Sequence, residues 1–299
     1  MIANRLESGD TIGFVCPSHI ASPEKYERNI SVLEALGFHI KCGENMYRNT
    51  YGYLASEQER ADDFNAMACD AQVKMVLFGG GEGGNELLPY LDYGAIQKNP
   101  KVYCSYSDGT TILNAIHSRT GLVTYYGQAP GTFYDLRHYD YMQFESNFVQ
   151  AKRTFTAGEK WHTLCGGRCE GVLIGGYTRN FALLQGNRYF SFDAGKQYIL
   201  FLEDHEKFSD IAAVSSYISH IEQSELIHRI SGLLFGHYSG TTFPELLNRL
   251  ERFGRRYQLP VVYCNDFGHG VSHGILPIGI PATLDADQQT LCYGASTVD

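Results

Sequence analysis

The stretch KVYCSYSDGTTILNAIHSRTG, residues 101–121, decides the fold of this chain. Strand-forming residues run through Cys104, and after a short polar turn an apolar-striped helix pattern ends at Gly121. Two serines, Ser105 and Ser107, occupy the turn. A strand that passes directly into a helix is the repeating unit of α/β folds. The same unit should therefore recur on both sides of this stretch.

Upstream residues repeat the alternation of strand and helix. The runs 11–16 (TIGFVC) and 73–78 (VKMVLF) are apolar and short enough for buried strands. Ser22, followed by proline, and the capping box of Ser56 with Glu59 predict the starts of two helices. Alternation of this kind implies right-handed crossovers and a mostly parallel sheet with helices on both faces. We therefore predict an α/β first domain whose ligands bind at the carboxyl ends of the strands.

Downstream, the pattern changes. From about Tyr134 to Lys160 an aromatic-rich and then polar stretch looks like a domain connection. Beyond it CEGVLIGG, YILFLED, GLLFGHYS and PVVYCNDFGHG are strand-like, with one clear helix pattern at roughly 209–222. A length of 299 residues suggests two domains, at about 150 residues per domain. We predict a first domain over residues 1–150, and a linker with a smaller, β-rich second domain over residues 151–299.

Composition excludes several classes of function. The formal net charge is −9 and no cluster of Lys and Arg could neutralise a phosphate backbone, so nucleic acid is not an expected partner. No stretch of about 20 apolar residues appears, so we expect a cytoplasmic protein that does not cross a membrane. The eight scattered cysteines are interpreted as free thiols. His162, Cys165 and Cys169 lie close in sequence but lack a fourth ligand, so no metal is predicted.

The glycine-rich run after the strand 73–78 has two interpretations. Gly79, Gly81 and Gly84 fit the pattern G-x-G-x-x-G of dinucleotide-binding folds. That fingerprint belongs to the first strand–helix unit and requires an acidic residue at the end of the next strand, about 20 residues on. Here the unit is a later one, and the next strand ends in Cys104-Ser105. A non-catalytic nucleotide-binding module is the alternative that this run supports. In either case the glycines present backbone N–H groups without side chains in the way.

Steric considerations distinguish the two serines. A nucleophile elbow places small residues two positions before and two positions after the nucleophile. Ser107 has Ser105 and Gly109 at these positions, whereas Ser105 would have the large Tyr103. Ser107 is therefore the candidate nucleophile, and the N–H of Asp108 at the helix start is a candidate oxyanion donor. The alternative is that Ser107 only caps the helix.

A serine nucleophile requires a histidine base and a group that orients it. Among eleven histidines, His269 stands out because it lies between two glycines directly after a strand, and His273 is its competitor. Glu203 and Asp204 end the strand YILFLED and are the candidate carboxylates. A surface position at the end of the strand is the alternative interpretation for both acids.

These segments resemble one family over nearly the whole chain. GDTIGFVCPS, GGGEGGNELLPYLDY and NPKVYCSYSDGTTILNAIHSRTGLVTYYG are similar to the first-domain signatures of the LD-carboxypeptidases. CEGVLIGG, ILFLED and FGHG followed by LPIGIPATLDA resemble the second-domain signatures. This family of serine peptidases includes muramoyltetrapeptide carboxypeptidases and microcin C immunity peptidases.

The resemblance implies a Ser-Glu-His triad of Ser107, Glu203 and His269. It implies an oxyanion hole from the N–H groups of Asp108 and Gly80, and no metal or organic cofactor. The implied fold is a flavodoxin-like parallel sheet domain with a second, smaller β-rich domain, and the implied assembly is a homodimer. The implied reaction is hydrolysis of an amide next to a free carboxylate.

Two branches of the family differ in substrate. Gly79 to Gly83 and the following Asn85-Glu86 look more like the microcin-immunity branch than the peptidoglycan-recycling branch. By that likeness Lys207 would meet a substrate carboxylate and Trp161 would stack on a nucleotide base, and Gly81 joins them as a substrate-binding position. The predicted substrates are a muropeptide stem and an aminoacyl-nucleotide of the microcin C type.

Overall fold

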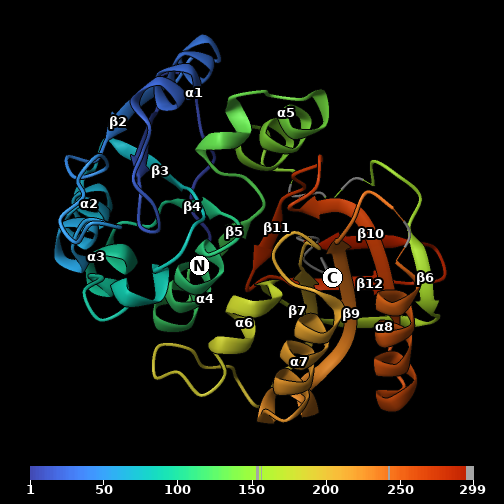
Figure 1. The fold of residues 1–299 in the computed structure, drawn as a ribbon. Coiled ribbons are helices and arrows are strands. Elements are labelled where there is room, and N and C mark those ends of the chain that lie inside the picture. The colour runs from blue at the N-terminus through green and yellow to red at the C-terminus, as the bar shows by residue number, and fades with distance from the viewer. Residues whose placement is uncertain (153–154, 156, 242, 294–299) are drawn as a thin grey trace.

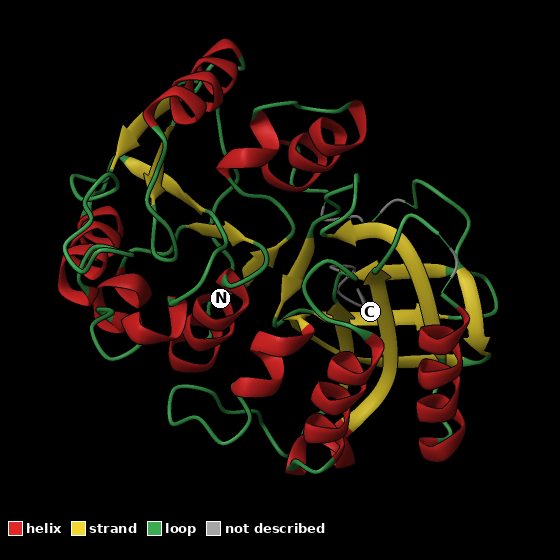
Figure 2. Cartoon of the chain, viewed as in Figure 1, coloured by secondary structure: helices red, strands yellow, loops and turns green. Residues whose placement is uncertain are grey.

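The structure is a computed structural model that describes residues 1–152, 155, 157–241 and 243–293. Its strands form two sheets that lie side by side, one built mainly from each half of the chain, with helices packed around both (Figure 1, Figure 2). The first half lies on the left of Figure 1 and the second half on the right.

The first sheet is parallel except at one edge. Its strands are β1 (Thr11–Val15), β2 (His39–Cys42), β3 (Val73–Phe78), β4 (Val102–Ser105), β5 (Thr124–Tyr126) and β11 (Leu276–Ile278). They run in the order β11-β5-β4-β3-β1-β2, and only β11 is antiparallel to its neighbour. The first five strands have the flavodoxin-like order, which confirms the predicted fold class.

Helices cover both faces of this sheet. They are α1 (Pro23–Ala35), α2 (Glu57–Cys69), α3 (Tyr93–Lys98), α4 (Gly109–Thr120) and α5 (His138–Phe144). Because side chains alternate along a strand, Val76 of β3 joins the hydrophobic cluster of α2, α3 and α4, while Leu77 joins the cluster of α1 and α5. The predicted capping box at Ser56 is confirmed, since its Oγ accepts from the N–H of Glu59 and α2 begins there.

The aromatic-rich stretch after Tyr134 is more regular than the sequence indicated. It contains α5 and a π-helical turn, Glu145–Val149. Phe144 and Phe148 are buried and pack edge-on against each other. Phe144 also packs edge-on against Phe133 of the preceding 3₁₀ turn, Pro130–Phe133. The aromatic residues at these positions therefore serve the core rather than a pocket.

The second sheet is built around a parallel centre. Its strands are β6 (His162–Cys165), β7 (Arg168–Tyr177), β8 (Tyr198–Glu203), β9 (Ile230–His237), β10 (Val261–Gly268), β12 (Pro281–Asp285) and β13 (Thr290–Tyr293). The order is β13-β12-β7-β8-β9-β10-β6, with β7 to β10 parallel. Helices α6 (Thr178–Leu183), α7 (Ile211–Glu222) and α8 (Pro244–Tyr257) accompany it. The second half is thus richer in helix than the single pattern at 209–222 predicted, because α6 and α8 were missed.

The parallel strands of both sheets deliver their carboxyl ends to a common region. Ser107 follows β4, Glu203 ends β8 and His269 follows β10. The larger hydrophobic cluster runs without interruption from α4 of the first half into β7 and β8 of the second. A shared core therefore sets the position of the two sheets relative to each other.

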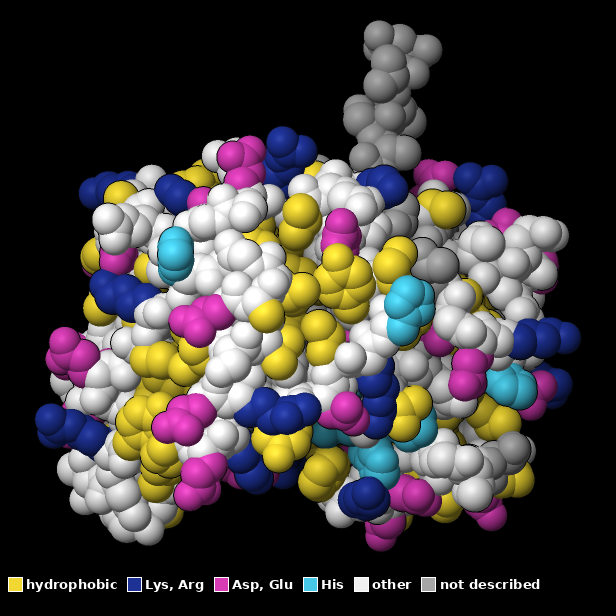
Figure 3. All heavy atoms as spheres, turned by 90° about the horizontal axis from the view of Figure 1, so that it is seen from above, with side chains coloured by type: hydrophobic (Ala, Val, Ile, Leu, Met, Phe, Trp, Pro, Cys, Tyr) yellow, Lys and Arg dark blue, Asp and Glu magenta, His cyan; other side chains and the backbone are white. Residues whose placement is uncertain are grey.

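None of the helices in the described part of the chain is long and apolar enough to span a membrane. On the face seen in Figure 3, Lys and Arg side chains are interspersed with Asp and Glu. That face offers no continuous cationic track for a phosphate backbone.

Candidate active site

The turn between β4 and α4 places Ser107 at its apex. The φ angle of Ser107 is 57°, in the left-handed region that few residues with side chains adopt. Ser105 is fully buried instead, and its Oγ donates to the carbonyl of Phe78 at 2.6 Å. A Cβ atom at Gly109 would collide with that Oγ. The turn thus has the strained backbone and small flanking residues of a nucleophile elbow, with Ser107 as its central residue.

Ser107, His269 and Glu203 are in direct contact. The Nε2 atom of His269 lies 2.9 Å from the Oγ of Ser107, and the Nδ1 atom lies 2.9 Å from Oε2 of Glu203. The side chain of Glu203 is 0% exposed and that of His269 is 11% exposed. A hydrogen-bonded line therefore runs from a buried carboxylate through the imidazole to a half-buried hydroxyl.

Two carboxylates act on the imidazole. Burial disfavours the charged ring, but the charge and hydrogen bond of Glu203 and the charge of Asp204 outweigh burial, so the pKa of His269 is raised above 6.5. Asp204 is itself buried, and burial together with the neighbouring charge of Glu203 raises its pKa to about 7. The site is thus arranged to stabilise a protonated His269, the state formed when a base takes a proton from a serine.

Two backbone N–H groups lie beside Ser107 without a protein acceptor within the described residues. They are the N–H groups of Asp108 and Gly80. A Cβ atom at Gly80 would lie 2.6 Å from the Cβ of Ser107, so only glycine permits this close approach. The carboxylate of Asp108 is buried, and it accepts from the N–H of Gly84 and from Nδ2 of Asn180, both at 2.6 Å. The contact with Gly84 fixes the turn relative to the glycine-rich run, and the contact with Asn180 fixes it relative to α6.

Comparison with known families identifies the family of this chain. A model described as the LD-carboxypeptidase N-terminal domain matches residues 12–127, and one described as the LD-carboxypeptidase C-terminal domain matches residues 170–284. The chain belongs to the LD-carboxypeptidase family. It is accordingly a hydrolase of the serine peptidase class.

Named relatives and solved structures match this chain over 93–100% of its length. A putative carboxypeptidase of Streptomyces coelicolor is 30% identical, over 96% of this chain and 94% of its own length. The microcin C7 self-immunity protein MccF of Escherichia coli is 26% identical over 97% and 95%, and the murein tetrapeptide carboxypeptidase of Pseudomonas aeruginosa is 25% identical over 93% and 94%. MccF in its wild-type apo state and MccF with aspartyl sulfamoyl adenosine each match with a TM-score of 0.87, 26% identity and 100% coverage of both chains.

In this LD-carboxypeptidase the loop after β8 lies beside the triad. Lys207 is exposed, and its ammonium group has no protein partner within the described residues. The next residue, Phe208, is 63% exposed and its ring lies 5.0 Å from that of His269. The rings of Tyr106 and Tyr177 also flank His269, at 5.3 and 5.0 Å. The sequence analysis missed these three aromatic neighbours, because their spacing in the chain carries no sign of their meeting.

Two of the predicted substrate-binding residues, Trp161 and Gly81, are packed against other parts of the protein. Trp161 is 2% exposed, its Nε1 donates to Oδ2 of Asp266 at 2.7 Å, and its ring packs on Phe155. A ring buried in this way has no open face for a base to stack on. Gly81 has a φ of 144° and packs against the backbone of Ser18, within the glycine-rich run beside Gly80.

His273, the competing histidine, has a different partner. Its Nδ1 lies 3.1 Å from Oδ2 of the buried Asp140, and its N–H donates to Oδ1 of the same carboxylate at 2.7 Å. This pair ties the loop after β10 to α5 of the first half. His273 therefore supports the loop that carries His269 and does not contact Ser107.

Two further polar contacts that the sequence analysis missed join the halves at this edge. Arg179 of α6 forms an ion pair with Glu82 of the glycine-rich run at 2.5 Å. The second is the contact of Asn180 with Asp108 described above. A local signal for either contact is absent from the sequence, because each joins segments that lie 72 or more residues apart.

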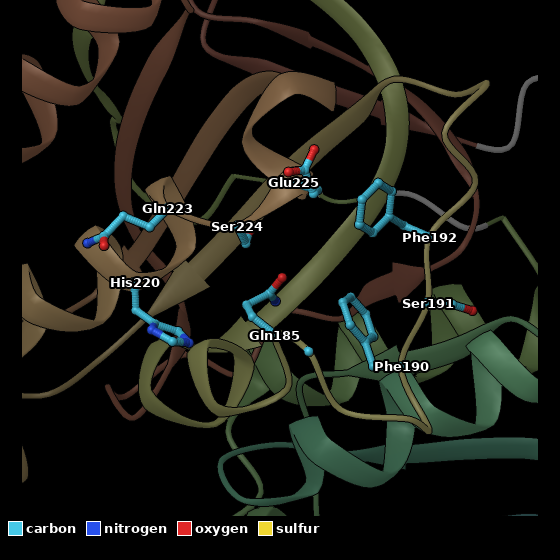
Figure 4. Close-up of a pocket in the computed structure, with 9 residues that line it drawn as sticks. Gln185, Phe190, Ser191, Phe192, His220, Gln223, Ser224 and Glu225 are labelled. Carbon is cyan, nitrogen blue, oxygen red and sulfur yellow. The ribbon is translucent and has the colours of Figure 1, made fainter.

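A separate hollow lies near the amino ends of β8 and β9, away from Ser107, His269 and Glu203. Its volume is about 640 Å³, and its lining includes Gln185, Phe190, Phe192 and His220 (Figure 4). The lining comes from the loop after α6 and from the carboxyl end of α7, near the amino ends of the parallel strands. No triad residue lines it. Among the described residues, no group of three or more His, Cys, Asp or Glu side chains could hold a metal ion.

Proposed function

We propose that this LD-carboxypeptidase hydrolyses an amide bond next to a free carboxylate through a triad of Ser107, His269 and Glu203. The observation that carries the proposal is the pair of 2.9 Å contacts that His269 makes, one from each ring nitrogen. A base that contacts the nucleophile on one side and an orienting carboxylate on the other is the arrangement that activates a serine hydroxyl.

In the first half-reaction, Oγ of Ser107 attacks the amide carbon while its proton passes to Nε2 of His269. The N–H groups of Asp108 and Gly80 bind the negative charge that develops on the carbonyl oxygen. The C–N bond then breaks, His269 returns the proton to the nitrogen, and the amine leaves. An ester between Ser107 and the acyl group of the substrate remains.

In the second half-reaction, a water molecule gives a proton to His269 and attacks the ester carbon. The C–O bond to Ser107 breaks, and the proton returns from His269 to Oγ. The products are a carboxylic acid and an amine, and the enzyme is restored. Throughout both half-reactions, Glu203 orients the imidazole and stabilises the charged ring.

Two substrate classes fit this reaction. Relatives include a murein tetrapeptide carboxypeptidase and MccF, and MccF has been solved with aspartyl sulfamoyl adenosine. We propose that the substrate of this chain is a muropeptide stem or an aminoacyl-nucleotide of the microcin C type. Lys207 would bind the free carboxylate of either substrate, because it is an exposed cation without a partner in the described residues four positions after Glu203. The N–H of Gly81 would contribute to the same subsite.

The test uses purified protein, both substrates and mass spectrometry of the products. Ser107→Ala and His269→Ala should each reduce kcat by a factor of about 10⁴ or more while the fold is kept. A serine-directed phosphonate should label wild type and the matched control Ser105→Ala, but not Ser107→Ala. Activity near wild type in Ser107→Ala would contradict the triad, and saturable binding of NAD or ATP without any labelling would favour the nucleotide-binding module.

We also propose that the chain is a cytoplasmic homodimer with halves at residues 1–150 and 151–299. The support is the resemblance to the family together with the extents of the two family models, 12–127 and 170–284. Sedimentation at micromolar concentration should give twice the mass of 33.5 kDa. A single 33.5 kDa species would contradict the dimer, and recovery from the membrane fraction of cells would contradict the location.

A further inference from the structure

The hydroxyl of Tyr126 lies between two groups of the triad. It accepts a hydrogen bond from the N–H of Ser107 at 3.0 Å and donates to Oε1 of Glu203. The direction of both bonds follows from chemistry, since a backbone N–H can only donate and the phenol has a single proton to give. Burial and the charge of Glu203 raise the pKa of Tyr126 well above 10, so the phenol keeps that proton.

The position of Tyr126 is fixed from both halves of the molecule. It lies on β5, where it is paired with Ser105 of β4, two residues before Ser107. Its side chain is 0% exposed, and its ring packs 5.8 Å from that of Phe201 on β8. β8 ends two residues later at Glu203. The hydroxyl is therefore held where a strand of the first sheet meets the catalytic strand of the second.

Each oxygen of Glu203 has its own partner. Oε2 accepts from Nδ1 of His269 and lies 3.3 Å from its backbone nitrogen, while Oε1 accepts from Tyr126. Within the described residues no other donor contacts Oε1. Rotation of the carboxylate would therefore break one of these bonds in a buried place where no water could replace it. Tyr126 thus selects the rotation at which Oε2 faces the imidazole.

The second bond acts on the nucleophile. At a left-handed residue the backbone is strained, and such strain persists only where surrounding groups hold it. The N–H of Ser107 lies before the first turn of α4 and has no acceptor in the helix, so Tyr126 provides its only acceptor within the described residues. The same hydroxyl therefore holds the elbow and the carboxylate together.

We propose that Tyr126 is a positioning residue that couples the backbone of Ser107 to the carboxylate of Glu203 across the two halves of the chain. The inference rests on the proposed function, because it assigns to Tyr126 the alignment of that triad. Two bonds made by one atom require Ser107 and Glu203 to move together. The triad can therefore keep its geometry although its members come from different sheets.

Tyr126→Phe tests the proposal by removing one oxygen atom. The matched control is Tyr103→Phe on the adjacent strand, because Tyr103 is also 0% exposed and its hydroxyl has no hydrogen-bond partner. Tyr126→Phe should lower kcat and the rate of labelling by a serine-directed phosphonate by about 10- to 100-fold, the loss expected for a hydrogen bond to a charged group. KM should change by no more than about 3-fold, because ground-state binding is not involved. Tyr103→Phe should match wild type in all these quantities.

The pH profile separates positioning from a purely structural role. Without the phenol proton, Glu203 holds the imidazolium more strongly, so the acidic limb of kcat/KM should move to higher pH in Tyr126→Phe. Replacing Tyr126 with 3-fluorotyrosine keeps the shape and strengthens the donor, so the limb should move to lower pH. This second variant keeps the test valid if Tyr126→Phe fails to fold.

Different results would contradict the role of Tyr126 and the proposed function. If wild type is labelled and active, but Tyr126→Phe and the fluorinated protein share its rate and pH profile, the coupling is wrong and the triad stands. If wild type is neither labelled at Ser107 nor active on either substrate, the proposed function is wrong and the inference fails with it.

Discussion

At the scale of single residues, neighbouring residues of the same chemical type in the site differ in backbone conformation and in contacts. Ser105 and Ser107 differ in backbone conformation, and only the residue at φ 57° lies in contact with His269. Glu203 and Asp204 are both buried, yet only Glu203 bonds to the imidazole. Asp204 instead accepts from the N–H of His205 at 2.8 Å and acts on His269 through its charge alone.

Asp204→Asn should shift the pH dependence of the reaction. Wild-type kcat/KM should rise with pH through a value above 6.5, because His269 must lose its proton to act as a base and its pKa is raised. The variant lacks one negative charge beside the imidazole, so its acidic limb should lie at lower pH. A pH–rate profile measures this shift, and an unchanged or higher limb would contradict the role of Asp204.

The same variant should change stability in a defined pH window. The pKa of Asp204 is raised from 3.8 to about 7 on folding, so the folded state binds this proton more tightly than the unfolded state. Its contribution to stability is therefore complete below about 3.8 and is lost as pH rises to about 7. The denaturation midpoint of Asp204→Asn, taken relative to that of wild type, should increase as pH rises across that window. Above about pH 7 the difference between the two midpoints should stay constant. Divergence outside the window would point to a different group.

At the scale of elements, three strands lead to Ser107, Glu203 and His269. β8 ends at Glu203, β10 ends directly before His269, and β4 ends two residues before Ser107. β4, β8 and β10 point their carboxyl ends toward the same region, and tight turns there aim the side chains. Gly268 at the end of β10 has a φ of 103°, and a Cβ atom there would lie 2.7 Å from Oε2 of Glu203. The residue before His269 is glycine for two reasons, the backbone angle and the space that the carboxylate occupies.

Gly268→Ala and Gly121→Ala should separate these two reasons. Gly121 ends α4 with a φ of 71° and open space where a Cβ would lie. Gly121→Ala should lower the free energy of unfolding by about 1–2 kcal/mol, the cost of a left-handed alanine, and leave kcat unchanged. Gly268→Ala should have a similar or larger cost and also lower kcat by about 10-fold or more, because the new methyl group displaces Glu203. Urea denaturation and steady-state kinetics measure both quantities, and equal kcat in the two variants would contradict the explanation.

At the scale of the whole molecule, the two halves share structure as well as a site. β11, at residues 276–278, belongs to the second half in sequence but adds an edge strand to the first sheet by pairing with β5. The larger hydrophobic cluster includes buried residues of both sheets. The separation of the chain predicted at residue 150 is thus incomplete in space.

Unfolding should therefore occur in one step. Trp161 is the sole tryptophan, and it is buried in the second half, so its fluorescence reports on that half. Far-ultraviolet circular dichroism reports on both sheets. Because the core is continuous, the two probes should give the same midpoint and slope in urea. Two resolved transitions would show that the halves unfold independently and that the shared core contributes little.

Local sequence determined the strand–turn–helix units, the start of α2 at its capping box, and the choice of Ser107, because backbone propensity, capping and steric limits act within a few residues. It also marked His269 between its glycines. The resemblance to the family added Glu203 as the acid, although local sequence left Glu203 and Asp204 equal. Tertiary structure alone decided that Trp161 is buried against Asp266, that β11 joins the first sheet, and that Tyr126 lies between Ser107 and Glu203. Each of these contacts joins residues between 19 and 154 positions apart. They meet because two sheets pack around one core, and that packing leaves no local trace in the sequence.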